Sequence, residues 1–128
     1  MSGAIRIVVA DDEPDLRLLL RMQLSQQDGM VVVDEAEDGA EAVAAVERSH
    51  ATAVVMDLLM PGVSGFEGIS ELQRDHPDVA IVAYTAVAGE FVRSEMQRLG
   101  VELVLKSGNI APLSEALRRA AGSRERTG

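Results

Sequence analysis

The stretch VVMDLLMPG, residues 54–62, joins the pattern of a buried strand to a charged residue. Its opening residues are apolar, as expected for a parallel strand that is covered on both faces. Asp57 follows directly, and Pro61-Gly62 favours a turn soon afterwards. A carboxylate is costly to remove from water unless another group compensates its charge. The position of Asp57 at the end of a core strand therefore raises the question of what offsets that charge.

The same alternation of strand and helix patterns runs through the whole chain. Short apolar segments occur at residues 5–10, 31–36, 53–57, 79–84 and 102–106. Each is followed by apolar residues at helical spacing; in the first case these are Leu16, Leu19, Leu20 and Leu24. Glycine and proline mark most of the joins. Five strand–helix repeats predict an α/β fold, with a parallel sheet, helices on both sides and right-handed crossovers.

The composition excludes several classes of protein. At 128 residues, the chain is long enough for one domain with a core and too short for two. It has no cysteine, which excludes a disulfide framework and a thiolate metal site. A net charge of −9 and few aromatic residues disfavour direct nucleic-acid binding, which needs clustered cations and stacking rings. No apolar run approaches the length of a membrane span, so we expect a cytoplasmic protein without a membrane partner.

Polar residues follow four of the five predicted strands. Asp11 and Asp12 end the first strand, Asp57 ends the third, Thr85 follows the fourth and Lys106 ends the fifth. The carboxyl ends of parallel strands lie at the same end of the sheet, where α/β proteins bind their ligands. We therefore expect three carboxylates, one hydroxyl and one ammonium to converge there.

Each of these residues also has a purely structural explanation. Asp12 or Asp15 could cap the first helix, and Thr85 could cap the helix that follows it. Lys106 could extend its ammonium from a strand end into water. However, Lys106 is the only lysine in the chain, which otherwise uses eleven arginines for positive charge. A compact ammonium at this position indicates a specific function, because lysine and arginine are not interchangeable.

Repulsion among the clustered acids also favours a functional explanation. Two unit charges about 4 Å apart repel by about 4 kcal/mol at an effective dielectric constant of 20. Three neighbouring carboxylates must therefore take up a proton or hold a cation. A hard divalent ion such as Mg²⁺ suits a site made of oxygen ligands alone.

These residues resemble those of response regulator receiver domains, which are phosphorylated switches in bacterial two-component signalling. The resemblance covers about residues 4–121. It is carried, in chain order, by IRIVVADDEP (5–14), AEDGAEAV (36–43), VVMDLLMPGVSG (54–65), VAYTA (82–86) and VLKSG (104–108). It implies a flavodoxin-like (βα)5 three-layer sandwich whose five parallel strands have the order 2-1-3-4-5.

The resemblance also implies roles for the acidic residues. Asp57 would be the phosphoacceptor, receiving a phosphoryl group from a phosphohistidine on a sensor histidine kinase. Asp12, Asp57 and the backbone carbonyl of Leu59 would ligate Mg²⁺, and Asp11 would act through a bound water molecule. The product would be an aspartyl phosphate, so the protein would be a phosphorylation-activated signalling switch and not an enzyme in its own right.

Thr85 and Lys106 would contact the phosphoryl group, and two nearby positions depart from the family pattern. Leu103 stands where receivers usually carry a switch tyrosine or phenylalanine, so coupling through an aromatic side chain is in doubt. Ser107 stands where receivers usually carry a proline after a cis bond, which leaves the Lys106–Ser107 conformation open.

Two residues near the predicted site also bear on the lifetime of the phosphorylated state. In this family it depends partly on the residues two positions after the acceptor and two after the threonine, which are Leu59 and Val87 here. Because neither can orient an attacking water molecule, we predict slow autodephosphorylation.

The domain boundaries and the partners are expectations of the same kind. We expect a receiver domain at residues 1–121 and a flexible tail or truncated linker at 122–128. The Lys-Ser-Gly pattern resembles receivers joined to a helix-turn-helix output domain, and the sequence leaves open whether the chain stands alone. The expected partners are a sensor histidine kinase and a downstream output domain or protein on the face that follows Thr85, with homodimerisation left open.

Two other functions share parts of this pattern. An aspartate-nucleophile phosphatase would carry a second aspartate two residues after the nucleophile, where this chain has Leu59, so its general acid is missing. A degenerate receiver, serving as a phosphorylation-independent protein-binding module, remains the alternative because of Leu103 and Ser107.

Overall fold

The computed structural model describes the backbone of residues 3–86 and 88–127 and the side chains up to residue 122. Five strands alternate with five helices along the chain. In order, they are β1 (Ile5–Ala10), α1 (Pro14–Ser25), β2 (Met30–Ala36), α2 (Gly39–Ser49), β3 (Ala53–Met56), α3 (Gly65–Asp75), β4 (Ala80–Thr85), α4 (Glu90–Leu99), β5 (Glu102–Leu105) and α5 (Ala111–Thr127).

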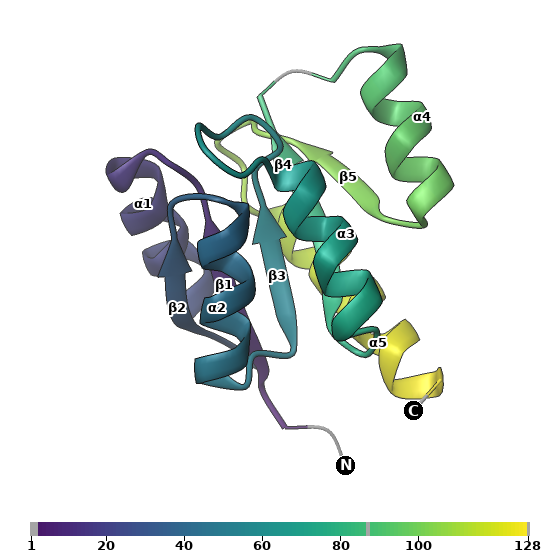
Figure 1. Ribbon diagram of the computed structural model, residues 1–128. Helices are drawn as coiled ribbons and strands as arrows, with labels where there is room; N and C mark the ends of the chain where they lie inside the picture. Colours follow the sequence, from purple (N-terminus) through teal and green to yellow (C-terminus); the bar gives the residue numbers. More distant parts are fainter. Residues whose placement is uncertain (1–2, 87, 128) are drawn as a thin grey trace.

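The strands form one parallel sheet in the order β2-β1-β3-β4-β5, with β2 and β5 as the outer strands. Helices α2, α3 and α4 pack on one face, where Met56, Leu72 and Met96 are buried together. Helices α1 and α5 pack on the other face over Ile7 and Val9. Figure 1 shows these three layers, which confirm the predicted α/β sandwich and strand order.

The helices on the α2 side begin at residues suited to helix starts. Asp38 precedes α2 and accepts a hydrogen bond from the backbone N–H of Glu41. Ser64 and Glu67 form a capping box at the start of α3, each side chain bonding the other residue's backbone N–H. The start of α3 is therefore well defined directly after the loop that follows Asp57.

Helix α1 differs from the pattern that the sequence predicts. Leu20 and Leu24 are buried, but Leu19, which the apolar spacing groups with them on one helical face, is 44% exposed. Because 3.6 residues complete a helical turn, the three consecutive leucines 18–20 spread over more than half of the helix circumference. They cannot all face the sheet.

Helix α5 extends beyond residue 121, where the sequence predicts the end of the domain. Its backbone continues to Thr127, so most of the expected tail is helical. Whether these residues lead into a further domain stays a prediction. No helix in the described part of the chain is both long and apolar enough to span a bilayer.

Glycines bring α2 and α3 unusually close to the sheet and to each other. A Cβ atom at Gly65 would lie 2.1 Å from the Asp57 carbonyl oxygen and 2.8 Å from the Leu58 Cα. A Cβ atom at Gly68 would lie 2.9 Å from the Gly39 Cα. Both neighbours are backbone atoms, which cannot move aside as a side chain can. The start of α3 is therefore pressed against the backbone of Asp57 itself.

We expect Gly65→Ala to lower the free energy of unfolding by about 3 kcal/mol, because the new methyl group overlaps fixed backbone. Gly122→Ala is the matched control, since a Cβ there meets no atom within 4 Å. It should raise stability by up to about 1 kcal/mol through helix propensity. Urea denaturation of both variants measures the two changes, and equal effects would contradict the close approach at Gly65.

Candidate functional site

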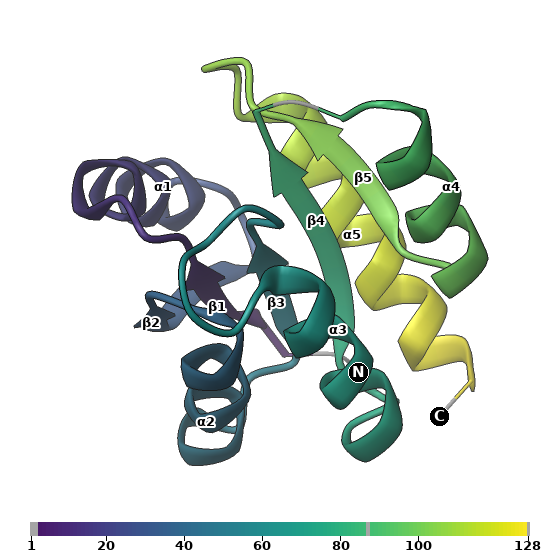
Figure 2. The same cartoon turned by 45° about the horizontal axis from the view of Figure 1, so that its top comes forward.

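The backbone places the predicted site residues directly beyond the ends of the strands. Asp11, Asp57 and Lys106 each follow the last residue of a strand and extend the hydrogen bonding of the sheet by one residue. The Asp11 N–H donates to the carbonyl of Ala36 at 3.0 Å, and the Asp57 N–H donates to that of Ala10 at 3.0 Å. Figure 2 shows the loops that follow these strands together at one end of the sheet.

The carboxylates of Asp11, Asp12 and Asp57 form one cluster. One oxygen atom from each lies within 4.8 Å of the others. Asp11 and Asp57 are buried, with Asp57 only 5% exposed, whereas Asp12 is half-buried at the mouth of the cluster. Carboxylate oxygens in this number and spacing are the ligands that a hard divalent cation prefers. The cluster could therefore hold a metal ion.

Lys106 follows the outer strand β5 and contacts two of the three acids. Its Nζ donates to Asp11 Oδ2 at 2.7 Å and to Asp57 Oδ2 at 3.2 Å. Its own backbone N–H donates to the Thr85 carbonyl at 2.9 Å, which ties β5 to β4 at the site. The ammonium is thus shared between two carboxylates, with the shorter contact to Asp11.

The charges in the cluster shift the pKa values of two of its members. Burial raises the pKa of Asp57, and the neighbouring Asp11 charge adds to that effect. The Leu59 N–H, at 3.1 Å from Asp57 Oδ1, and the Lys106 ammonium oppose the rise without reversing it. Burial lowers the pKa of Lys106, but the hydrogen bond and charge of Asp11, with the charge of Asp57, raise it overall. Lys106 is therefore charged at neutral pH, and ionised Asp57 carries a net energetic cost.

The structural explanations considered for the acids and for Thr85 fail. Helix α1 has Glu13 at its N-cap, without a side-chain capping bond, so neither Asp12 nor Asp15 caps it. Helix α4 has Gly89 at its N-cap, so Thr85 does not cap it either. Thr85 is instead the fully buried last residue of β4.

The positions that depart from the family pattern have ordinary surroundings. Leu103 is half-buried in the core on the α4 side and pairs with Ala83 of β4. No cis peptide bond occurs in the described part of the chain, so Lys106–Ser107 is trans. Leu59 is 62% exposed beside the cluster. Val87 lies outside the described residues, and the role of the Leu59 carbonyl stays a prediction.

Sequence reasoning missed one residue at this site. Arg17 of α1 donates from Nη1 to the backbone carbonyl of Asp11 at 2.6 Å. Its Nε also donates to Oε1 of Glu35 in β2, at 3.0 Å. No pattern near Arg17 in the sequence predicts this pair, because the partners are 18 residues apart on different elements.

Residues 7–118 match the family model of the response regulator receiver domain. The chain belongs to this family. Response regulators act in two-component signalling, and receivers of this family have the fold seen here. In this receiver the three acids and the lysine lie together at one end of the sheet.

Several bacterial relatives resemble this receiver along most of its length. The response regulator GacA of Pseudomonas protegens is 33% identical over 104 residues, covering 81% of this chain and 49% of that protein. A LuxR-family response regulator from Aurantimonas matches with a TM-score of 0.86 and 30% identity, covering 96% of this chain and 88% of that one. The response regulator TrrA of Thermotoga maritima, in complex with Mg²⁺-BeF, matches with a TM-score of 0.79 and 34% identity, covering 90% and 97%. The receiver spans about half the length of the first curated relatives that it matches.

We expect Asp57→Asn to raise the free energy of unfolding at pH 7 without metal by roughly 1 kcal/mol or more, because it removes a buried charge while Lys106 keeps Asp11 as its partner. The native state holds the Asp57 proton more tightly than the unfolded chain, whose pKa is near 3.8. The free energy of unfolding of the wild type therefore falls as the pH rises from the unfolded pKa of Asp57 through its higher native pKa. The difference in this free energy between Asp57→Asn and the wild type shrinks as the pH is lowered toward 4.

Asp34→Asn is the control for this measurement. The hydrogen bond from Arg48 lowers the pKa of Asp34, so that ionised carboxylate stabilises the native state and its loss should have the opposite sign. Urea denaturation in EDTA at several pH values measures both effects. Destabilisation by Asp57→Asn at pH 7 would contradict a net cost of the Asp57 charge.

Proposed function

We propose that this receiver is a phosphorylation-activated switch in which Asp57 accepts a phosphoryl group from a sensor histidine kinase. The observation that carries this proposal is the buried Asp57 carboxylate beside the Lys106 ammonium, at the end of the sheet that is open to ligands. A carboxylate becomes a competent nucleophile toward phosphorus when neighbouring cations offset the repulsion between the two reactants.

In the proposed transfer, one Asp57 oxygen forms a bond to the phosphorus atom of a phosphohistidine. The bond between phosphorus and the imidazole nitrogen breaks, and its electron pair stays on that nitrogen. Asp57 becomes an acyl phosphate, which water can later cleave to restore the carboxylate and release inorganic phosphate. Lys106, already within 3.2 Å of Asp57, would pair with a phosphoryl oxygen.

The acidic cluster suits Mg²⁺ as the cofactor of this transfer. Asp12, Asp57 and the Leu59 carbonyl would hold the ion, and Asp11 would contact it through water. The oxygen-only donor set and the unbalanced negative charge of the cluster support this assignment. Mg²⁺ supplies positive charge to the phosphoryl oxygens when bound.

The switch would act through Thr85 and the surface that follows it. A phosphoryl group adds negative charge and acceptor oxygens beside β4, toward which the Thr85 hydroxyl would move. Helix α4 begins five residues later and presents Phe91 to solvent, with 73% of that residue exposed. Exposed aromatic surface is typical of sites that bind a partner protein. We propose this face as the one that an output domain or protein reads.

The remaining assignments follow from the same proposal. The domain would lack an enzymatic activity of its own beyond its phosphoryl transfer and hydrolysis, and it would act in the cytoplasm without contacting nucleic acid or membrane. Its similarity to a LuxR-family regulator supports a helix-turn-helix output in a longer protein.

We expect incubation with acetyl phosphate and Mg²⁺ to add one phosphoryl group to the wild type, as measured by intact-mass spectrometry. The adduct should be absent when EDTA replaces Mg²⁺ and absent in Asp57→Asn. Asp78→Asn is a control, because Asp78 lies between α3 and β4, away from the cluster. This variant should be modified like the wild type.

The proposal would be contradicted if the folded wild type gained no phosphoryl group from acetyl phosphate or from any tested histidine kinase. A titration with Mg²⁺ then tests the alternative, since absence of binding at millimolar metal would favour a receiver that serves as a phosphorylation-independent binding module.

We also expect the aspartyl phosphate to be long-lived and Leu59→Gln to shorten its lifetime several-fold, because an exposed amide beside Asp57 can orient an attacking water molecule. Leu105→Gln is a matched control, as Leu105 is also an exposed leucine but lies on β5. Release of inorganic phosphate over time measures both. A wild-type half-life of seconds would contradict slow autodephosphorylation.

A further inference from the structure

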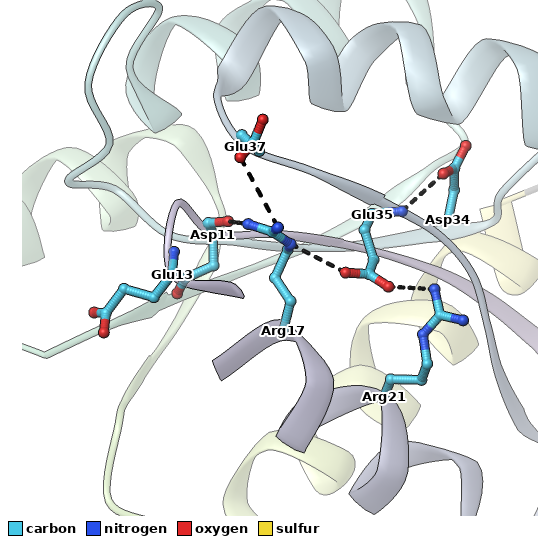
Figure 3. Close-up of polar contacts among 7 residues, drawn as sticks. All are labelled: Asp11, Glu13, Arg17, Arg21, Asp34, Glu35 and Glu37. Atoms are coloured by element: carbon cyan, nitrogen blue, oxygen red, sulfur yellow. Dashed lines mark hydrogen bonds and ion pairs between the residues drawn. The ribbon is translucent and has the colours of Figure 1, made fainter. Parts of the chain in front are cut away.

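Arg17 joins the loop after β1, which carries Asp11 and Asp12, to the C-terminal end of β2 and to Glu37 just beyond it (Figure 3). Each of the three nitrogen atoms of its guanidinium makes one of these contacts. Nη1 donates to the backbone carbonyl of Asp11 at 2.6 Å, and Nε donates to Glu35 Oε1 at 3.0 Å. Nη2 lies 3.9 Å from Glu37 Oε1. The Arg17 side chain is only 13% exposed, whereas that of Glu37 is 63% exposed, so the contact with Glu37 is the one open to water. Such a buried charge is stabilised by its partners and, in turn, holds them in place.

The position of Glu35 depends on an irregularity in β2. Ile7 of β1 pairs with Val32, but the next residue, Val8, pairs with Asp34, so Val33 is an extra residue in β2. This bulge changes which face the following side chains point to. Glu35 pairs with Val9, whose side chain belongs to the core on the α1 side. The bulge thereby directs Glu35 toward α1 and Arg17.

The loop after β1, which carries Asp11 and Asp12, is held by three hydrogen bonds that Asp11 accepts, two through its carboxylate and one through its backbone carbonyl. Asp11 Oδ2 already accepts from Lys106, and Asp11 Oδ1 accepts from the backbone N–H of Glu13 at 2.9 Å. By contrast, no described residue forms a hydrogen bond or ion pair with the Asp12 side chain. The Asp12 carboxylate is therefore positioned by its backbone alone, and Arg17 holds the peptide group between Asp11 and Asp12.

We propose that Arg17 is a positioning residue for the metal site, which clamps the Asp11–Asp12 peptide to Glu35 and so directs the Asp12 carboxylate toward the cluster. This inference rests on the proposed function, because it assumes that the cluster binds Mg²⁺. Arginine suits this role, since its planar fork holds Nε and Nη1 at separate points, one facing the Glu35 carboxylate and the other the Asp11 carbonyl. Lysine, with a single compact ammonium, would keep the charge and lose the bridge.

Calorimetric titration with Mg²⁺ tests the clamp without any phosphoryl transfer. We expect Arg17→Gln to raise the Kd for Mg²⁺ about tenfold, as residues that orient metal ligands commonly do when they are replaced. Arg17→Lys should recover little of this loss. Arg21→Gln is the matched control, because Arg21 also pairs with Glu35 from α1 but has no contact with Asp11. It should bind Mg²⁺ like the wild type.

The rate of phosphorylation by acetyl phosphate separates positioning from general stability. In Arg17→Gln, the Mg²⁺ concentration that gives half-maximal rate should rise in proportion to the Kd, while the rate at saturating Mg²⁺ stays near that of the wild type. If Arg17→Gln fails to fold, Glu35→Gln provides the second variant, since it removes the charge that holds Arg17 and should weaken Mg²⁺ binding in the same direction.

Two results would overturn the clamp: unchanged Mg²⁺ affinity in folded Arg17→Gln, or an equal loss in Arg21→Gln. A third measurement, hydrogen exchange of the Asp12 and Glu13 amides in EDTA, separates the clamp from the proposed function. If the wild type bound no Mg²⁺, the proposed function would fail. Faster exchange in Arg17→Gln than in Arg21→Gln would then still support a clamp on the loop, and equal exchange would overturn it.

Discussion

The imbalance of charge at the carboxyl end of the sheet governs the rest of this structure. Three carboxylates lie together there, and the Lys106 ammonium is the cation paired with them in the described part of the chain. Three carboxylates against one shared ammonium leave a formal excess of two negative charges, which one divalent ion would balance. The pKa of Asp57 rises in response, because burial and its acidic neighbour outweigh the help from Lys106. The site thus carries an excess of negative charge that a divalent cation could neutralise.

This incomplete site depends on backbone geometry more than on its side chains. Asp11, Asp57 and Lys106 are held by sheet hydrogen bonds one residue beyond their strands, so the sheet order itself brings them together. The start of α3 also lies so close to the Asp57 carbonyl that a Cβ atom at Gly65 would overlap it. Leu103 and Ser107, which depart from the family pattern, leave this framework unchanged, since Lys106 reaches both acids from a trans peptide.

The sequence predicts the strands and the residues of the acidic cluster well, but it predicts the contacts between their side chains poorly. The strand positions follow from the alternation of apolar segments with residues at helical spacing. The cluster follows from the rule that the carboxyl ends of parallel strands lie at the same end of the sheet. Asp11, Asp12, Asp57 and Lys106 could therefore be found without coordinates. The shorter contact of Lys106 with Asp11 could not be found, because it depends on side-chain geometry.

The errors have physical causes that lie outside any local pattern. Leu19 is exposed although its spacing matches that of the buried Leu20 and Leu24, since an apolar run on a helix does not reveal which residues reach the sheet. Arg17 was missed because its partner Glu35 faces α1 only through the bulge at Val33, and nothing in a run of three valines marks where such a bulge falls.

The bulge and the arginines have a further consequence for β2 as an outer strand. One side of this strand has no neighbour in the sheet, and such a strand can join a strand of another molecule and begin aggregation. Charged groups and bulges disfavour that association. Here Asp34 pairs with Arg48 on the α2 side, and Glu35 pairs with Arg17 on the α1 side, directly after the bulge. The arginine that we propose to hold the loop after β1 is therefore also part of the charged, bulged segment that distinguishes this edge of the sheet from a flat apolar one.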